Sequence, residues 1–245
     1  MKRIVLTFVA ILLSTTLFAN DKQFDKLFKD GTLRIDYTFM GNAHEQHVAL
    51  RDMSYTDNWY GRRINLDNVP LKGNGDLTLT DSISGEVIYK TSFSSLFQEW
   101  ITTPEALEVV KSFEFTLLVP MPKKQAVATL VLRDNTGKES IHKYTIDPND
   151  TLIRNRSNQK PLPYKYIHKG GDSKGAIDVV ILAEGYTADQ MELFMEDAII
   201  AKKEILDYQP FSSHSEKFNF IGYKVIHVID IARCEVARHV EGHEV

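Results

Sequence analysis

The sequence predicts a β-sandwich N-terminal domain, followed by the truncated opening of an α/β domain that consists of a strand plus a helix. Short segments of alternating apolar and polar residues recur at near-regular spacing up to Ile146. This pattern is typical of a sandwich of antiparallel strands. From Ile177 the pattern changes to a continuous apolar run and then to a helical repeat. A strand that feeds a helix in this way is the opening unit of an α/β domain.

Composition limits the class of protein. The chain has 245 residues, of which 43% are hydrophobic and 25% charged, so one or two globular domains are expected. Its net charge is −4, whereas nucleic-acid binding normally requires a basic surface. We therefore expect no nucleic-acid partner. The single cysteine, Cys234, cannot form an internal disulfide, which fits a bacterial exported protein.

The N-terminus has the pattern of a cleaved signal peptide over residues 1–19. A basic start precedes an apolar region from Ile4 to Phe18, and Ala19 is a small residue suited to cleavage. A membrane anchor is the alternative, but the apolar run is short for a span and no second one follows. We expect an exported protein of the periplasm, cell surface or medium, with no membrane contact after cleavage.

The predicted sandwich covers residues 20–150. Residues 21–30 are expected to form a weak helix, and a short helix should run to Lys111 from Thr103 as its cap and Pro104 at its first position. Gly137 lies in a turn that joins the last two strands as a hairpin. The expected strands are Leu33–Met40, His47–Tyr55, Leu77–Thr80, Glu86–Phe93, Phe113–Val119, Ala126–Arg133 and Glu139–Ile146.

The segment after the sandwich reads as a connector. Three prolines and the Gly170-Gly171 pair lie between Asp147 and Gly175, a composition that marks a domain boundary. We therefore expect a linker over residues 151–175 and the start of a second domain over residues 176–225.

The second domain is expected to open with a strand, a turn and a helix. The β-branched run that begins at Ile177 favours a strand that is covered on both faces. Gly185 provides the turn, and Thr187 with Gln190 forms a capping box that starts the helix. Pro210 ends it. The residues at helical spacing, which should form one apolar stripe, are Met191, Phe194, Ala198, Ala201 and Ile205.

Two places could bind a ligand. Glu184 and Tyr186 follow the carboxyl end of the predicted strand, where open α/β sheets bind ligands; the alternative, which we favour, is that they only close the turn. Trp59 and Tyr60 lie beside Arg62 and Arg63. Such a cluster could bind an acidic or sugar ligand, but more often it stacks on a sandwich surface.

Two histidine groups resemble metal-binding patterns. A zinc-peptidase helix carries two histidines four residues apart, with a glutamate directly after the first. The stretch from His44 to His47 has its second histidine one position early, and we interpret it as a surface loop. His239 and His243 have the correct spacing and Cys234 lies upstream, so a Cys-His-His zinc site is conceivable, although no fourth ligand is near.

Several long segments resemble, in order, the secreted M64 family of metallopeptidases called IgA peptidase M64. They are GRRINLDNVPLKGNGDLTL, YKTSFSSLFQEW, VPMPKK and above all IDVVILAEGYT, and the likeness runs from about Leu33 to about Val225. The resemblance implies an N-terminal β-sandwich followed by a zincin-like α/β peptidase domain whose zinc is held by an HExxH helix further along the chain.

The chain departs from that family in two respects. Its 245 residues contain no HExxH motif, and residues 226–245 form an atypical tail. A truncated or frameshifted reading would explain both. We therefore assign no catalytic, cofactor-binding or metal-ligating residue. We expect no cofactor in this chain and expect zinc only in complete members of the family. The expected function is the inactive N-terminal portion of a secreted zinc peptidase acting on proteins. The alternative is a non-enzymatic module that binds a protein or glycan.

Overall fold

A computed structural model of the chain describes residues 23–69, 71–159, 163–173 and 175–224. The chain divides into two compact units, with the division after Asn158. The expected signal peptide and the tail that contains Cys234, His239 and His243 lie outside the described residues. Among the described residues, no helix is long and apolar enough to cross a lipid bilayer.

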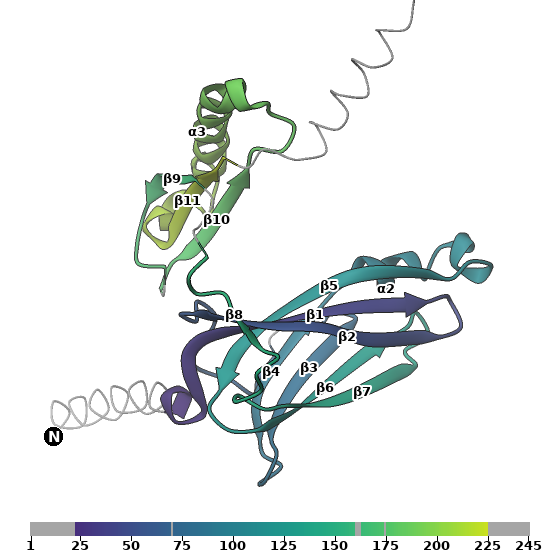
Figure 1. Cartoon of the computed structure of the whole chain (residues 1–245). Helices are drawn as coiled ribbons and strands as arrows, with labels where there is room; N and C mark the ends of the chain where they lie inside the picture. Colours follow the sequence, from purple (N-terminus) through teal and green to yellow (C-terminus); the bar gives the residue numbers. More distant parts are fainter. Residues whose placement is uncertain (1–22, 70, 160–162, 174, 225–245) are drawn as a thin grey trace, which may run out of the picture. The chain divides into compact units, whose positions relative to one another are not determined.

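The first unit consists mainly of two four-stranded sheets (Figure 1). One sheet has the order β5-β1-β2-β8 and the other the order β4-β3-β6-β7. All neighbours are antiparallel except β2 and β8. The strands are β1 (Phe28–Gly41), β2 (Gln46–Asp57), β3 (Gly75–Asp81), β4 (Val87–Phe93), β5 (Lys111–Pro122), β6 (Ala126–Arg133), β7 (Glu139–Ile146) and β8 (Arg154–Asn155).

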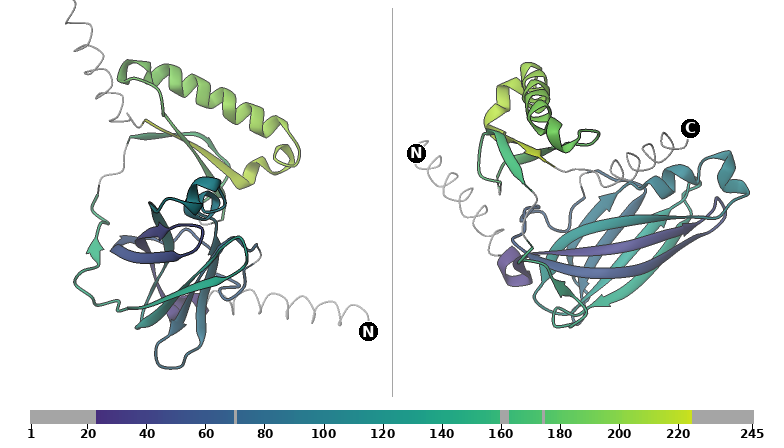
Figure 2. Two further views of the ribbon diagram at one scale, coloured as in Figure 1. Left: turned by 90° about the vertical axis from the view of Figure 1, so that its right-hand side faces the viewer. Right: turned by 45° about the horizontal axis from the view of Figure 1, so that its top comes forward.

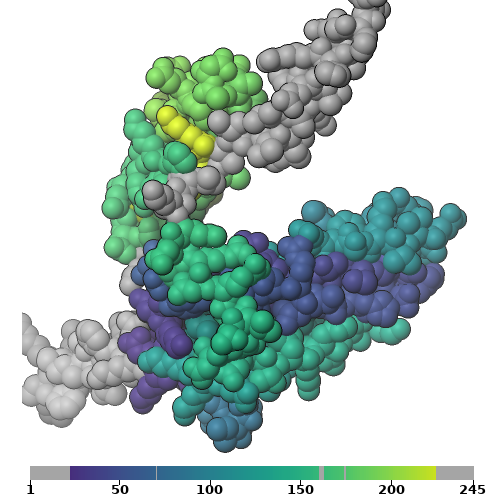
Figure 3. Space-filling view, viewed as in Figure 1, coloured from purple at the N-terminus to yellow at the C-terminus, as the bar shows by residue number. Residues whose placement is uncertain are grey.

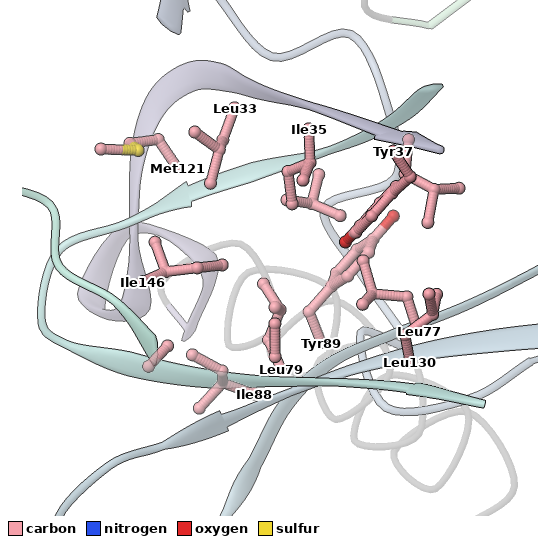
Figure 4. Close-up of a cluster of buried hydrophobic side chains, with 14 of the residues drawn as sticks. Leu33, Ile35, Tyr37, Leu77, Leu79, Ile88, Tyr89, Met121, Leu130 and Ile146 are labelled. Atoms are coloured by element: carbon pink, nitrogen blue, oxygen red, sulfur yellow. The ribbon is translucent and has the colours of Figure 1, made fainter. Parts of the chain in front are cut away.

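The inward faces of these two sheets share one hydrophobic core (Figure 4). Every second residue of β6 is buried, from Ala126 to Leu132, because successive side chains of a strand point to opposite faces. Leu33 and Ile35 of β1 meet this layer from the other sheet. Within the core, the hydroxyl groups of Tyr37 and Tyr144 are hydrogen-bonded. These two hydroxyl groups therefore satisfy each other within the core.

The helices of the first unit differ from the prediction. Residues 23–27 are helical, but β1 begins at Phe28, inside the segment expected to be helix. The helix expected from Thr103 to Lys111 is only a 3-10 turn, η1 (Pro104–Leu107), because the chain must turn into β5 at Lys111. The sequence prediction missed helix α2 (Leu96–Trp100), whose N-terminus is capped by the hydroxyl group of Ser95.

The second unit is a three-stranded sheet with the order β10-β11-β9 and a helix on one face (Figure 2). β10 and β11 are parallel, and β9 is antiparallel to β11. The chain crosses between the two parallel strands through α3, as parallel neighbours require. The elements are β9 (Tyr164–Lys169), β10 (Ile177–Leu182), η2 (Ala188–Gln190), α3 (Met191–Asp207), η3 (Ser212–Lys217) and β11 (Phe218–Tyr223).

Three predictions for this part of the chain need correction. The linker expected over residues 151–175 contains β8 and β9, and β9 belongs to the second unit. The strand β10 is not covered on both faces, since Val180 and Leu182 are 47% and 57% exposed. The apolar stripe of α3 packs only near its start: Phe194 and Ala198 are buried, whereas Ile205 is exposed. The three-stranded sheet is too small to cover the whole helix.

Candidate functional site

The turn after β10 places Glu184 and Tyr186 at the carboxyl end of the strand. Ala183 is fully buried and Gly185 has a φ of +85°, a left-handed conformation that favours glycine. The predicted capping box then starts the helix, because the Gln190 side chain accepts a hydrogen bond from the Thr187 N–H at 3.0 Å. The prediction of a strand, a turn and a capped helix is confirmed in this segment.

The side chain of Tyr186 closes this turn onto the helix. Its hydroxyl group donates a 2.8 Å hydrogen bond to Asp197 on α3, and this bond raises the pKa of Tyr186. Its ring packs against Phe194 with the ring centroids 5.4 Å apart. Glu184 is exposed. Within the described residues its carboxylate has no hydrogen-bond or ion-pair partner. The arrangement supports a structural role for Tyr186 and leaves only Glu184 free for a ligand.

Sequence reasoning missed the polar centre of this unit, Asn219. Its side chain is completely buried on β11. The Asn219 Oδ1 atom accepts hydrogen bonds from the backbone N–H groups of Gly170 and Gly171 at 3.0 and 3.1 Å. Its Nδ2 atom donates to Asp178 at 2.7 Å. A Cβ atom on Gly170 would lie 2.6 Å from two backbone carbonyl oxygens, so the glycine-rich loop serves close packing. The sequence signal for this role was an asparagine inside the apolar segment FNFIGY, because a buried amide needs hydrogen-bond partners.

The aromatic and arginine cluster of the first unit is not a shared exposed surface. Trp59 is only 5% exposed, whereas Tyr60 is 58% exposed. The Arg62 side chain donates to the backbone carbonyls of Leu66, Asn68 and Lys90. Arg63 pairs with Asp30 and lies 4.6 Å from the centroid of the Phe24 ring. These side chains hold a loop against the sandwich, in agreement with the alternative that the cluster stacks on a sandwich surface.

The described histidines do not form a zinc site. His47, the second residue of β2, lies 3.3 Å from the carboxylate of the exposed Glu45. His168 contacts the Ser215 carbonyl. Among the described residues, no three His, Cys, Asp or Glu side chains are placed to hold a metal ion. The described residues therefore do not fit the zinc that the resemblance implies, and no catalytic step through zinc can be derived from them. The Cys234, His239 and His243 site lies outside the described residues.

Comparison with known families matches each unit separately. Residues 23–144 match the family model described as Peptidase M64 N-terminus. Residues 166–229 match the one described as IgA Peptidase M64. No curated protein shows a significant match to the chain. The two matched segments fall on either side of the division between the compact units.

Proposed function

Because the chain belongs to the peptidase M64 family, we propose that it is the N-terminal portion of a secreted zinc peptidase that hydrolyses peptide bonds in proteins. In this proposal the sandwich is an accessory domain, and the second unit is the opening of a zincin-like peptidase domain. The order of the two family matches along the chain, one on each compact unit, is the observation that carries the proposal.

The surface of the second unit supports this interpretation. Residues paired across neighbouring strands share a face of the sheet, and the pairs Val180↔Ile221 and Leu182↔Tyr223 lie on the face opposite α3. Tyr166 and Tyr164 continue the same face on β9. Val180, Leu182 and Tyr164 are 47%, 57% and 46% exposed. An apolar sheet face of this kind is normally covered, and we assign its cover to further structure of the peptidase domain.

The chemistry of the family would come from elements other than the described ones. Zinc, when bound, polarises the scissile carbonyl and activates a water molecule. The 245 residues contain no HExxH motif to provide two ligands and a general base. We therefore expect the 245-residue chain to have no peptidase activity of its own. Within the proposed function, its first unit serves recognition or positioning.

A proteolysis assay tests this proposal. The purified 245-residue chain is incubated with casein and zinc, with and without a chelator, and peptide release is measured. We expect no release above the background of a preparation from cells that lack the gene. Cleavage that the chelator abolishes would contradict the proposed inactivity. In that case the variant His243→Ala would test whether the histidines near the C-terminus hold the metal.

A further inference from the structure

The outer edge of β5 is unusually regular for the edge of a sheet. β5 is the terminal strand of its sheet. It pairs with β1 without a register shift from Lys111↔Gly41 to Pro120↔Thr32. Of the other terminal strands in the sandwich, β8 has two residues, β4 seven and β7 eight, whereas β5 has twelve. Proteins normally blunt such edges with bulges, prolines or short strands. The prolines of β5 lie only at its end.

An aromatic pocket opens directly beside this edge. Its volume is about 240 Å³, which is sufficient for one large apolar side chain. Phe39 and Phe97 form its fully buried floor, and Phe113 and Phe115 of β5 are half-buried in its wall. The ring centroids of Phe39 and Phe115 are 5.0 Å apart, and those of Phe97 and Phe113 are 5.8 Å apart. The pocket therefore has a rigid aromatic lining.

Helix α2 supplies the rim of the pocket. Leu96, at the start of α2, lines the pocket and is 70% exposed, so an apolar side chain stands at the mouth. The hydroxyl group of Ser95 caps the helix, and Gln98 anchors it by donating to the backbone carbonyls of Asn74 and Arg133. Figure 3 shows the surface of this part of the sandwich, in teal. The rim is thus held in place by hydrogen bonds to the rest of the unit.

The edge and the pocket fit one kind of ligand together. Residues opposite each other in paired strands have their side chains on the same face. In a strand added to β5, the side chains opposite Phe113 and Phe115 would therefore enter the pocket. Those opposite Glu114 would stay on the outer face of the sheet. Recognition would then alternate with a period of two, as in other complexes formed by strand addition.

The charge around the pocket favours particular side chains at the polar positions of such a ligand. The charged residues that line the pocket are two glutamates, Glu99 and Glu114. Glu105 is paired with Lys111 and Glu114 with Arg51. Glu99 lines the pocket, and among the described residues its carboxylate has no ion-pair partner. Basic side chains next to the apolar ones would complement this rim.

We propose that the outer edge of β5 and its aromatic pocket bind an extended polypeptide segment by strand addition, with apolar side chains in the pocket and basic or polar ones between them. This proposal rests on the proposed function, because the accessory domain of a peptidase meets polypeptide substrates. The site would hold an unfolded part of the substrate. It assigns the recognition role of the first unit to one edge and one pocket.

Fluorescence anisotropy with a labelled nine-residue peptide tests the proposal on the 245-residue chain. In the probe, Phe or Leu alternates with Lys or Thr. One control peptide has the same composition without alternation, and a second carries N-methyl groups on alternate backbone amides. The variant Leu96→Asp places a charge at the pocket mouth. Its matched control is Leu107→Asp, which changes another exposed leucine that does not line the pocket.

We expect saturable binding of the alternating peptide that Leu96→Asp weakens by about tenfold or more, whereas Leu107→Asp leaves it unchanged. N-methylation should abolish binding, because it removes the donors that a paired strand needs. Equal binding of all three peptides, or of both variants, would overturn the proposal. The proposal would also be overturned if the chain bound no peptide and instead formed a dimer that Leu96→Asp disrupts. Peptide binding does not require cleavage. Hydrolysis of casein by the chain would therefore contradict the proposed inactivity without affecting the peptide-binding proposal.

Discussion

The two units of the chain differ in how completely they bury their apolar residues. The shared core of the sandwich contains twenty-two buried hydrophobic residues. The cluster between α3 and its sheet contains four, namely Ala183, Phe194, Met195 and Ala198. Both segments are rich in apolar side chains, so composition is not the cause. Two sheets can cover each other's inner faces completely, whereas the single helix covers one face of its sheet and leaves apolar residues of the edge strands exposed on the other.

This difference predicts that a cavity in the sandwich has the largest effect on stability. Phe39 is fully buried, and its ring packs on Phe93, Phe97 and Phe115. Phe39→Ala should reduce the free energy of unfolding of the sandwich by about 3–5 kcal/mol. Phe194→Ala should leave that transition unchanged and affect only the second unit. Urea denaturation followed by tryptophan fluorescence reports on the sandwich, because both tryptophans lie in it. An equal shift for both variants would mean that the two units unfold as one.

Stability of the second unit should depend on one polar side chain. Asn219→Ala removes the acceptor of the Gly171 N–H group, whereas the Gly170 N–H group keeps the Phe218 carbonyl and Asp178 keeps the Ser173 hydroxyl group. A loss of about 1–3 kcal/mol is expected, since one N–H group would lose its partner and the other two groups would each lose one of two partners. Faster hydrogen exchange at the Gly171 amide, with a smaller change at the Gly170 amide, would show this loss. Asn149→Ala, at an exposed position, is the control. Unchanged exchange in Asn219→Ala would mean that the loop is held by packing alone.

The buried pair of tyrosines in the sandwich predicts a non-additive result. Burial, and contact with Tyr144, raise the pKa of Tyr37 far above its usual value, so both groups remain neutral hydroxyls. Tyr144→Phe would leave the Tyr37 hydroxyl group without its partner and should cost about 1–2 kcal/mol. The double variant Tyr37→Phe/Tyr144→Phe removes both polar groups and should be more stable than the single one. Thermal denaturation of the two single variants, Tyr37→Phe and Tyr144→Phe, and of the double variant measures this, and simple additivity would contradict the pairing.

The smallest effect is expected from pH. Burial, and the nearby His47, lower the pKa of His142, whose Nε2 atom is buried without a hydrogen bond in the described part of the chain. As the pH falls, His142 is therefore protonated first in the unfolded chain, where its pKa is about 6.5. Stability should be highest above that pH and fall as the pH drops towards the folded pKa. His142→Leu should reduce the difference between urea midpoints at pH 5 and pH 7.5. An equal reduction in His44→Gln would contradict the assignment.

Local patterns predicted the parts of the fold that depend on neighbouring residues. The bounds of β6 and β7 agree with the expected strands, because their alternation follows burial on one face. The strand β9 was missed, because nearby prolines and glycines made its segment resemble a linker. Its pairing with β11 depends on residues about fifty positions away. The five-residue helix α2 is too short to give a periodic signal.

The candidate sites follow the same rule. The turn around Gly185 and its capping box is local, and it was predicted. The role of Asn219 depends on Gly170 and Gly171 from a distant segment. The aromatic pocket combines Phe39, Phe97 and Phe113 from three elements. No spacing within the sequence could have indicated that these rings meet.

Native-state hydrogen exchange of the 245-residue chain tests the central comparison most directly. Amides in the central strands of the sandwich, β3 and β6, should exchange only through global unfolding of that unit, because both strands lie inside a sheet with a complete core. Amides of β10, an edge strand with an exposed apolar face, should exchange through opening of much lower free energy. Equal protection in β6 and β10 would contradict the account, because the second unit would then be as completely covered as the sandwich.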